Sequence, residues 1–170
     1  MPAQPRSGCA INAAVEVLGD NWSLIVLRDI IFGNRRHFRE LLTCNDEGIA
    51  SNVLASRLRK LIDEGLLTKA EAARGQRAQY TLTEAGIQTL PVMVALGTWG
   101  MTHRETSPEL TIRSRTMADD PQTMADDPQL VAGLMDELRE THLGVPRPNP
   151  DEPRSSERLQ AAYEAEISGS

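Results

Sequence analysis

The stretch from Ala50 to Glu64 combines side chains that could bind nucleic acid. At about 100° per residue, its larger apolar residues gather on one face and its polar and cationic residues on the other. Small polar side chains allow a helix to approach a DNA groove closely, and Arg and Lys neutralise phosphates or bind guanine edges. Because most amphipathic helices are ordinary surface helices, the interpretation depends on the neighbouring segments. The polar face comprises Asn52, Ser56, Arg59, Lys60 and Asp63, with Ser51, Ala55 and Arg57 at its margins.

Two further groups of basic residues flank this stretch. Arg36 and His37, with Arg35 and Arg39, stand at the start of a short apolar pattern, where a helix N-terminus favours contact with phosphate. The second group lies in a Gly-containing polar loop between two short apolar runs, and an Arg at such a hairpin tip can enter a minor groove. Either group could instead be a solvated surface, which is the commoner meaning of a charge cluster. The second group consists of Arg74, Gln76 and Arg77.

The two cysteines offer thiol chemistry. Cys9 falls at or just before the start of a predicted helix, where the helix dipole and the nearby Arg6 favour a reactive thiolate. The alternative is a small residue at a helix start with no reactivity. Cys44 lies next to Asp46 and Glu47, whose negative charges disfavour a thiolate, so it is the weaker candidate. Two cysteines do not make a disulfide framework, which indicates a reducing cytoplasm.

Other chemistries find no support in the residue pattern. The three histidines, His37, His103 and His142, are scattered, and no Cys/His spacing suggests a metal site. The sequence has no nucleophile elbow, phosphate-binding loop or dinucleotide fingerprint. We therefore predict no enzyme, no catalytic residues, no metal and no cofactor. We also predict no membrane span and no signal peptide, because the chain has neither an apolar run of about 18 residues nor an apolar N-terminal segment.

The formal net charge of −6 conceals an uneven distribution. Residues 1–104 contain 12 Lys and Arg against 10 Asp and Glu, whereas residues 105–170 contain 6 against 14. The acidity therefore belongs to the C-terminal part. Because the local field steers a polyanion, the total charge does not argue against DNA binding by the N-terminal part.

The periodicity predicts the elements that would position these residues. Helices are expected over 9–18, 22–32 and 37–42, then a turn over 43–49 and a helix over 50–64. Two short strands, 66–70 and 80–82, surround the Gly-containing loop as a hairpin. A helix capped by Thr83 should run to about Arg104, with a kink or break at Pro91. Helix, turn, helix and hairpin in this order predict a mainly α fold with a small β-hairpin (α+β), the winged helix-turn-helix.

The composition suggests three regions. We expect residues 1–8 to be disordered, 9–107 to form the winged helix-turn-helix domain, and 108–170 to form an acidic C-terminal extension. In the extension, a heptad over 116–122 is repeated at 123–129, which we interpret as a local duplication that lengthens a loop. An amphipathic helix is predicted over 128–143. For the tail, a last helix over 155–167 and disorder are both open, because apolar residues are few.

At the level of whole motifs, the segment from Cys9 to Trp99 resembles the HxlR-type winged helix-turn-helix transcription regulators, relatives of the MarR group. The matching pieces occur in the order of the family. They are Cys9 with the helix that follows it, LGDNWSLIVLRDIIFGNRRHFRELL (18–42), GIASNVLASRLRKLIDEGLL (48–67), and YTLTEAG followed by LPVMVALGTWG (80–100).

This resemblance implies a cytoplasmic bacterial homodimer that binds an inverted-repeat operator, with the N-terminal and post-wing helices building the dimer. Asn52, Ser56, Arg57 and Arg59 match recognition-helix positions, and Arg77 matches a wing arginine. Cys9 matches a cysteine that senses oxidants or electrophiles in some members. Two departures concern the recognition helix. Ala50 stands where a capping Ser is common, so the cap could move to Ser51, and Lys60 replaces what is often an acid.

We therefore expect a DNA-binding transcriptional regulator, more a repressor than an activator, that contacts a palindromic operator as a homodimer. Its effector, a small molecule or an oxidant, is left open. Two alternatives remain: a thiol-based sensor that acts through Cys9, and a winged-helix module for protein interaction without DNA binding. The expected base contacts are Asn52, Ser56 and Arg59, and the expected backbone contacts include Arg36, Lys60 and the wing arginines. The full set of expected DNA-binding residues is Arg36, His37, Ser51, Asn52, Ser56, Arg57, Arg59, Lys60, Arg74 and Arg77.

Overall fold

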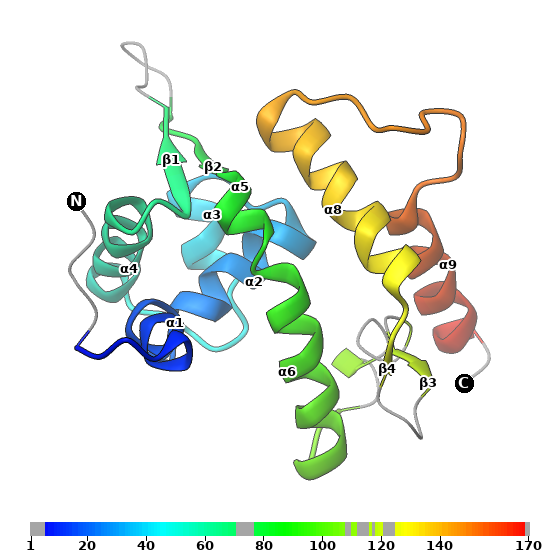
Figure 1. Cartoon of the computed structure of the whole chain (residues 1–170), viewed down its shortest axis with the longest axis horizontal. Helices are drawn as coiled ribbons and strands as arrows, with labels where there is room; N and C mark the ends of the chain where they lie inside the picture. The colour runs from blue at the N-terminus through cyan, green and yellow to red at the C-terminus, as the bar shows by residue number, and fades with distance from the viewer. Residues whose placement is uncertain are drawn as a thin grey trace. The chain divides into compact units, whose positions relative to one another are not determined.

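A computed structural model describes residues 6–70, 77–107, 110–111, 116, 118–120 and 125–168 (Figure 1). The chain divides into two compact units, up to Ile87 and from Gln88. This division differs from the change in composition at 107/108, from which we expected the domain boundary. Each unit is described by itself.

The N-terminal unit has the predicted order of elements. Its helices are α1 (Ala10–Leu18), α2 (Ser23–Gly33), α3 (Phe38–Thr43), α4 (Ser51–Asp63) and α5 (Glu84–Ile87), and its strands are β1 (Leu67–Lys69) and β2 (Tyr80–Leu82). The strands pair antiparallel, with Leu67 opposite Leu82. This arrangement confirms the mainly helical fold with a small hairpin.

An aliphatic core joins these elements. Helix α2 contributes Leu27 and Ile30, both fully buried, and α4 contributes its leucines at helical spacing. Fully burying such a side chain stabilises a fold by about 1.5–3 kcal/mol. The core therefore fixes which face of α4 turns inward. Further buried residues are Val26, Leu41, Leu54, Leu58, Leu61, Leu67, Leu82 and Ile87.

The start of α4 differs from one expectation. Ala50 itself is the N-cap residue, with extended backbone dihedrals, and it supplies no side-chain hydrogen bond. The cap does not move to Ser51, which is already the first helical residue. At the other end, Gly65 adopts a positive φ of 74°, a conformation that glycine reaches without steric cost and that ends many helices.

The helix expected over 83–104 is broken. Thr83 accepts a hydrogen bond from the Gly86 amide, so it caps α5 as predicted. The chain then begins a new helix, α6 (Leu90–His103), in the C-terminal unit, with Pro91 in its first turn. Proline is tolerated in a first turn because the amide that it lacks would have no helical partner there. Of the two expected outcomes at Pro91, the break is the one observed.

The C-terminal unit continues with β3 (Ala118–Asp120), β4 (Ala125–Asp126), α8 (Pro128–Leu143) and α9 (Ser155–Ser168). Helix α8 has the predicted bounds. We left a helix and disorder open for the tail; the structure has the helix, and Leu159 of α9 is buried. Glu137 of α8 accepts a hydrogen bond from the Ser156 amide at 3.2 Å, which holds the start of α9 against α8.

The duplicated heptad also has a structural role beyond lengthening a loop. The strands β3 and β4 come from its two copies and pair antiparallel. In the second copy, the Asp127 side chain accepts hydrogen bonds from the amides of Gln129 and Leu130, and Pro128 begins α8. The second copy therefore supplies the N-cap of α8.

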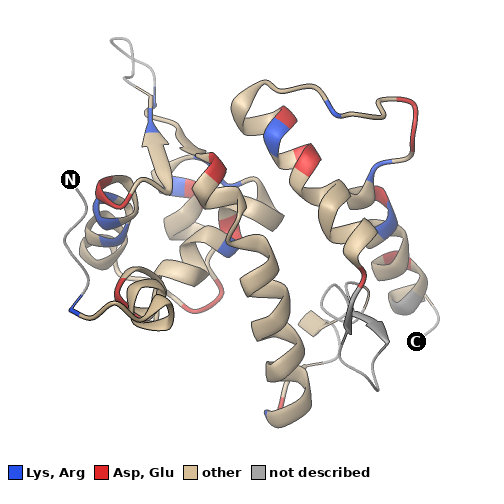
Figure 2. Ribbon diagram, viewed as in Figure 1, with Lys and Arg blue, Asp and Glu red and all other residues tan. Residues whose placement is uncertain are grey.

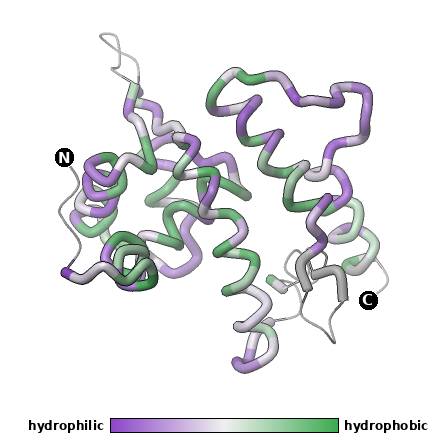
Figure 3. Tube along the Cα trace, in the orientation of Figure 1, coloured by the Kyte–Doolittle hydropathy of each residue, from purple (hydrophilic) through white to green (hydrophobic). Residues whose placement is uncertain are grey.

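Both α1 and α6 keep large apolar side chains exposed. On α1, Ile11 is 75% exposed and Val15 is 53% exposed. On α6, Val92, Leu96 and Trp99 recur at helical spacing and are between 44% and 49% exposed. Figure 3 shows the hydrophobic character of both helices. Trp99 is thus about half exposed and is not a core residue of its unit.

Within the described residues, no single helix is long and apolar enough to cross a membrane. The helices α1 and α2 reach the required length and composition only as a pair, and a bend of 77° separates them.

Candidate nucleic-acid interface

The polar face of α4 is exposed as the sequence predicts. Ser51, Asn52, Ser56 and Arg59 lie at the surface, whereas Leu54, on the opposite face, is fully buried. Arg59 has no ion-pair or hydrogen-bond partner among the described residues. Short polar side chains in the first turns let the helix approach base edges closely. An Arg without an intramolecular partner, one turn later, is then able to bind those edges.

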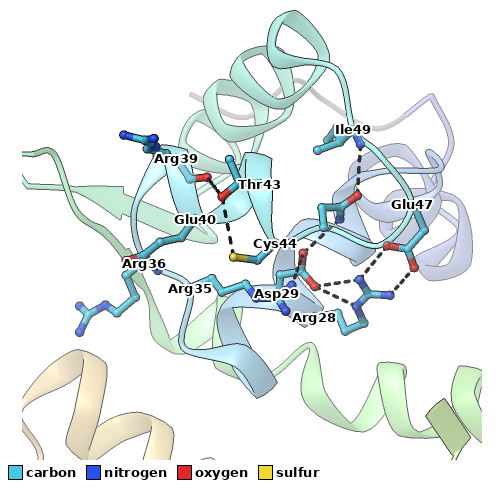
Figure 4. A network of polar contacts seen from close by, with 11 residues as sticks. Arg28, Asp29, Arg35, Arg36, Arg39, Glu40, Thr43, Cys44, Glu47 and Ile49 are labelled. Atoms are coloured by element: carbon cyan, nitrogen blue, oxygen red, sulfur yellow. Dashed lines mark hydrogen bonds and ion pairs between the residues drawn. The ribbon is translucent and has the colours of Figure 1, made fainter. Parts of the chain in front are cut away.

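A buried acid in α2 fixes the turn that leads into α4 (Figure 4). Asp29 is only 4% exposed and accepts hydrogen bonds from Arg28, at 2.8 and 3.0 Å, and from the side-chain amide of Asn45 at 3.1 Å. Asn45 in turn accepts the Ile49 amide at 3.2 Å. This chain of contacts runs from the core of α2 to the residue that precedes the Ala50 cap, so it sets where α4 begins.

The same network includes Arg35 and Glu47, two side chains for which the sequence predicted other roles. Arg35 belonged to the expected basic cluster, yet its guanidinium lies 3.3 Å from Asp29. The Glu47 carboxylate accepts hydrogen bonds from both terminal nitrogens of Arg28, at 2.6 and 2.9 Å. These hydrogen bonds lower the pKa of Glu47. The sequence signal for this network was an acid among the apolar residues of α2, because a buried carboxylate requires partners.

Arg36 and His37 attach the wing to the helices. The Arg36 guanidinium donates to the Tyr80 carbonyl at 3.2 Å and to the Thr81 hydroxyl at 2.7 Å, and the Arg36 carbonyl accepts the Tyr80 amide. The His37 ring nitrogen Nδ1 lies 3.1 Å from the Ala78 carbonyl. Both side chains therefore have intramolecular partners on or beside β2, which the expectation of a phosphate contact did not include.

Arg57 and Lys60 share an acidic partner as well. Lys60 Nζ lies 3.0 Å from one carboxylate oxygen of Asp20, and Arg57 Nε lies 3.2 Å from the other. Asp20 precedes α2, whose N-cap residue is Trp22, and its side chain accepts the amides of Trp22 and Ser23. The expected backbone contact of Lys60 thus has an internal competitor.

Four exposed cations of the N-terminal unit have no ion-pair or hydrogen-bond partner for their side chains within its described residues. Arg59 lies on α4, Arg39 on α3, Lys69 at the end of β1 and Arg77 before β2, and all four are exposed. Figure 2 shows Lys and Arg positions in blue on α4 and at the wing end of β1. Arg39 belonged to the basic cluster for which we expected phosphate contact, although not to the final set of DNA-binding residues. Lys69 was not expected, and its sequence signal was its place beside the wing loop. Arg74, at the expected wing tip, lies outside the described residues.

The two cysteines are both exposed free thiols. Cys9 is the N-cap residue of α1, as expected, without a side-chain capping hydrogen bond. Arg6, which we expected to assist its thiolate, instead pairs with Glu16 at 2.7 Å. Among the described residues, no group of three or more His, Cys, Asp or Glu side chains could hold a metal ion.

Comparisons with known proteins find one matching family and several relatives described as transcriptional regulators. A sequence model described as HxlR-like helix-turn-helix matches residues 17–108. A Mycobacterium tuberculosis (H37Rv) protein named an uncharacterized HTH-type transcriptional regulator is 34% identical over 120 residues, which cover 68% of this chain and 74% of that protein. A protein of the same description from Methanothermobacter thermautotrophicus is 31% identical, covering 59% and 79% of the two chains. A solved structure of PA1607, described as a candidate transcription factor, is 32% identical with a TM-score of 0.54, covering 61% and 70%.

Proposed function

The chain belongs to the HxlR-like helix-turn-helix family, and from that premise we propose that it is a homodimeric repressor that binds an inverted-repeat operator. The family and its relatives are DNA-binding transcriptional regulators and not enzymes. This class disfavours the third expectation, an interaction module without DNA binding. A regulator of chromosomal DNA works where that DNA is, so we also propose action in the cytoplasm.

The observation that carries the proposal is the exposed face of α4. Ser51, Asn52, Ser56 and Arg59 are presented by a helix whose other face is locked into the core. In a helix-turn-helix, this second helix lies in the major groove with its N-terminal residues at the base edges. We assign base contacts to Asn52, Ser56 and Arg59, and we place Ser51 at the groove edge.

For the DNA backbone we favour the exposed cations without acidic partners. Arg39, Lys69 and Arg77 meet this condition, and Arg74 stays a proposal from the sequence. Arg36 and His37 would act indirectly, because their hydrogen bonds hold the wing in place. Backbone contacts fix the register of the protein on the duplex, whereas base contacts specify the sequence.

The proposed dimer uses the exposed apolar residues of α1 and α6. The residues are Ile11 and Val15 on α1, and Val92, Leu96 and Trp99 on α6. They are exposed in the single chain, so association that removes them from water would be favourable. Exposed apolar side chains that recur on one helix are typical of protein interfaces. A two-fold dimer would place two recognition helices in successive major grooves about 34 Å apart, which requires a palindromic site.

Selection of bound sequences from a random DNA pool tests the proposal. We expect an enriched palindrome with half-sites about one helical turn apart, and lower transcription of a reporter under that sequence. Enrichment of no sequence would overturn sequence-specific binding. An enriched but non-palindromic site would overturn the dimeric arrangement alone, and raised reporter transcription would make the protein an activator.

A second candidate function is thiol sensing through Cys9. The supporting observation is that this exposed thiol begins α1, the helix that carries the proposed dimer residues Ile11 and Val15. Oxidation or alkylation there would alter the end of that helix. We expect peroxide or an alkylating agent to release DNA from the wild type and from Cys44→Ser but not from Cys9→Ser. Equal release from all three would remove the sensor role of Cys9.

A further inference from the structure

Asp20 stands at the junction of α1 and α2, and its own helix holds it in a fixed orientation. One carboxylate oxygen accepts the amides of Trp22 and Ser23, at 3.0 and 2.9 Å. The other accepts the hydroxyl of Ser23, a residue that is itself fully buried. The carboxylate therefore cannot turn away from what lies in front of it without breaking hydrogen bonds to its helix.

Two cations of α4 lie in front of this carboxylate. Lys60 Nζ approaches to 3.0 Å and Arg57 Nε to 3.2 Å, on different oxygens. All three side chains keep between 24% and 30% of their surface exposed, so a second anion could reach the cations. The Arg57 Nε atom itself is buried and forms no hydrogen bond, so such an anion would meet the other nitrogens of that guanidinium. At 100° per residue, Lys60 lies roughly 80° from Asn52 around α4, at the flank of the exposed face.

Carboxylate and DNA phosphate are alternative anionic partners for the same Lys and Arg side chains. Phosphate contacts strengthen binding to every sequence alike, because they do not distinguish the bases. A cation that is already paired adds less of this unselective affinity. The base contacts of Asn52, Ser56 and Arg59 would then contribute a larger share of the total binding free energy.

We propose that Asp20 withholds Arg57 and Lys60 from DNA phosphates and thereby raises the sequence selectivity of α4. The inference rests on the DNA-binding function proposed above. Asp20 is a positioning residue in this account, since it acts on DNA only through the two cations.

Asp20→Asn separates this role from helix capping. Asparagine caps helices about as well as aspartate, so the variant keeps the amide contacts of α2 while it removes the charge that holds the cations. Asp63→Asn is the matched control. It raises the net charge of the chain by the same amount, and Asp63 is an exposed residue of α4 with no hydrogen-bond or ion-pair partner within the described residues.

The experiment measures the dissociation constant over a range of salt concentrations. Two duplexes of equal length are used, the sequence selected from the random pool and a scrambled version. For Asp20→Asn we expect a slope of log Kd against log salt that is steeper by about one to two, since each new phosphate contact adds about 0.9. We also expect a lower ratio of selective to unselective affinity. Asp63→Asn should keep the wild-type slope.

Lys60→Gln provides an independent readout that does not need the Asp20 variant to fold. In the wild-type background, we expect it to leave the slope unchanged, because Lys60 is already paired. Added to Asp20→Asn, it should lower the slope by about one. A flatter slope for the single Lys60→Gln variant would show that Lys60 already contacts phosphate and would overturn the inference.

The failures of the two proposals are distinguishable. Selective wild-type binding, combined with the same slope for Asp20→Asn as for Asp63→Asn, would overturn this inference alone. Absence of selective binding by the wild type would overturn the proposed function, and this inference with it.

Discussion

The carboxylate of Asp20 has a pH dependence whose sign follows from its partners. Burial by itself would raise its pKa, but hydrogen bonds from Ser23 and Lys60 and from the amides of Trp22 and Ser23 outweigh burial and lower the pKa from 3.8 to about 2. An acid with a lower pKa in the folded chain stabilises the fold wherever it is ionised in both states. The contribution is therefore complete above about pH 4 and is lost as the pH falls toward 2.

We predict that Asp20→Asn lowers the free energy of unfolding by about 1 kcal/mol at neutral pH. The shift in pKa alone would correspond to about 2.5 kcal/mol, but this partly exposed group is screened by solvent, which reduces the value. Urea unfolding at pH 7, 4, 3 and 2 measures the difference, which should shrink between pH 4 and pH 2. A difference that is equal at every pH would assign the loss to something other than the Asp20 charge.

Arg59 carries the second prediction at the residue scale. Replacing it with Ala should cost about 1–3 kcal/mol of discrimination between the selected duplex and a duplex altered at one base pair, the usual value of a bidentate contact to guanine. Because Arg59 is exposed and has no partner among the described residues, the unfolding transition should not move. An unchanged footprint and unchanged discrimination would remove Arg59 from the base contacts.

At the scale of elements, the turn between α3 and α4 depends on Asn45. Its side chain donates to Asp29 and accepts the amide of Ile49, a residue that is only 4% exposed. We predict that Asn45→Ala destabilises the chain by about 1–3 kcal/mol, because it leaves a part-buried amide without this acceptor. Asp46→Ala, an exposed neighbour in the same turn, should change stability by less than about 0.5 kcal/mol. Equal effects would show that the turn does not depend on Asn45.

The helices and strands could be predicted from local sequence patterns, whereas the side-chain contacts between them could not. The faces of α4, the hairpin and the cap of α5 by Thr83 rest on residues close together in sequence, so periodicity and turn chemistry predicted them. The contact of Arg36 with Tyr80 spans 44 residues, and that of Lys60 with Asp20 spans 40. A basic side chain has the same local signature whether it faces phosphate or a carboxylate of the same chain. The internal partners of Arg36, His37, Arg57 and Lys60 were therefore invisible in the sequence.

The helix over 155–168 shows a different limit. Because the segment has few apolar residues, its sequence alone was compatible with either a helix or disorder. The structure buries Leu159 and ties the start of the helix to Glu137 of α8, so tertiary contacts decide the outcome.

At the scale of the whole molecule, the proposed dimer can be tested by introducing one charged side chain into its interface. Leu96 is 48% exposed, so Leu96→Glu should not disturb the folded monomer, whereas in a dimer interface it would bury a carboxylate. We predict that analytical ultracentrifugation gives about twice the chain mass for the wild type and a single chain mass for Leu96→Glu. Leu143→Glu, on an exposed apolar residue of α8, should remain dimeric. A monomeric wild type, or a dimeric Leu96→Glu, would contradict this interface.

The cap of α8 has a consequence for how this gene can change. The two heptads are identical, so deleting the first or the second gives one and the same shortened protein sequence. In that shortened sequence, the remaining heptad still ends in the Asp-Pro-Gln that begins α8. Slippage between the repeats can therefore alter the length of this connection in steps of seven residues without removing the cap of the helix. Loss of one copy would remove one strand of the β3–β4 pair, but it would keep the residues that cap α8.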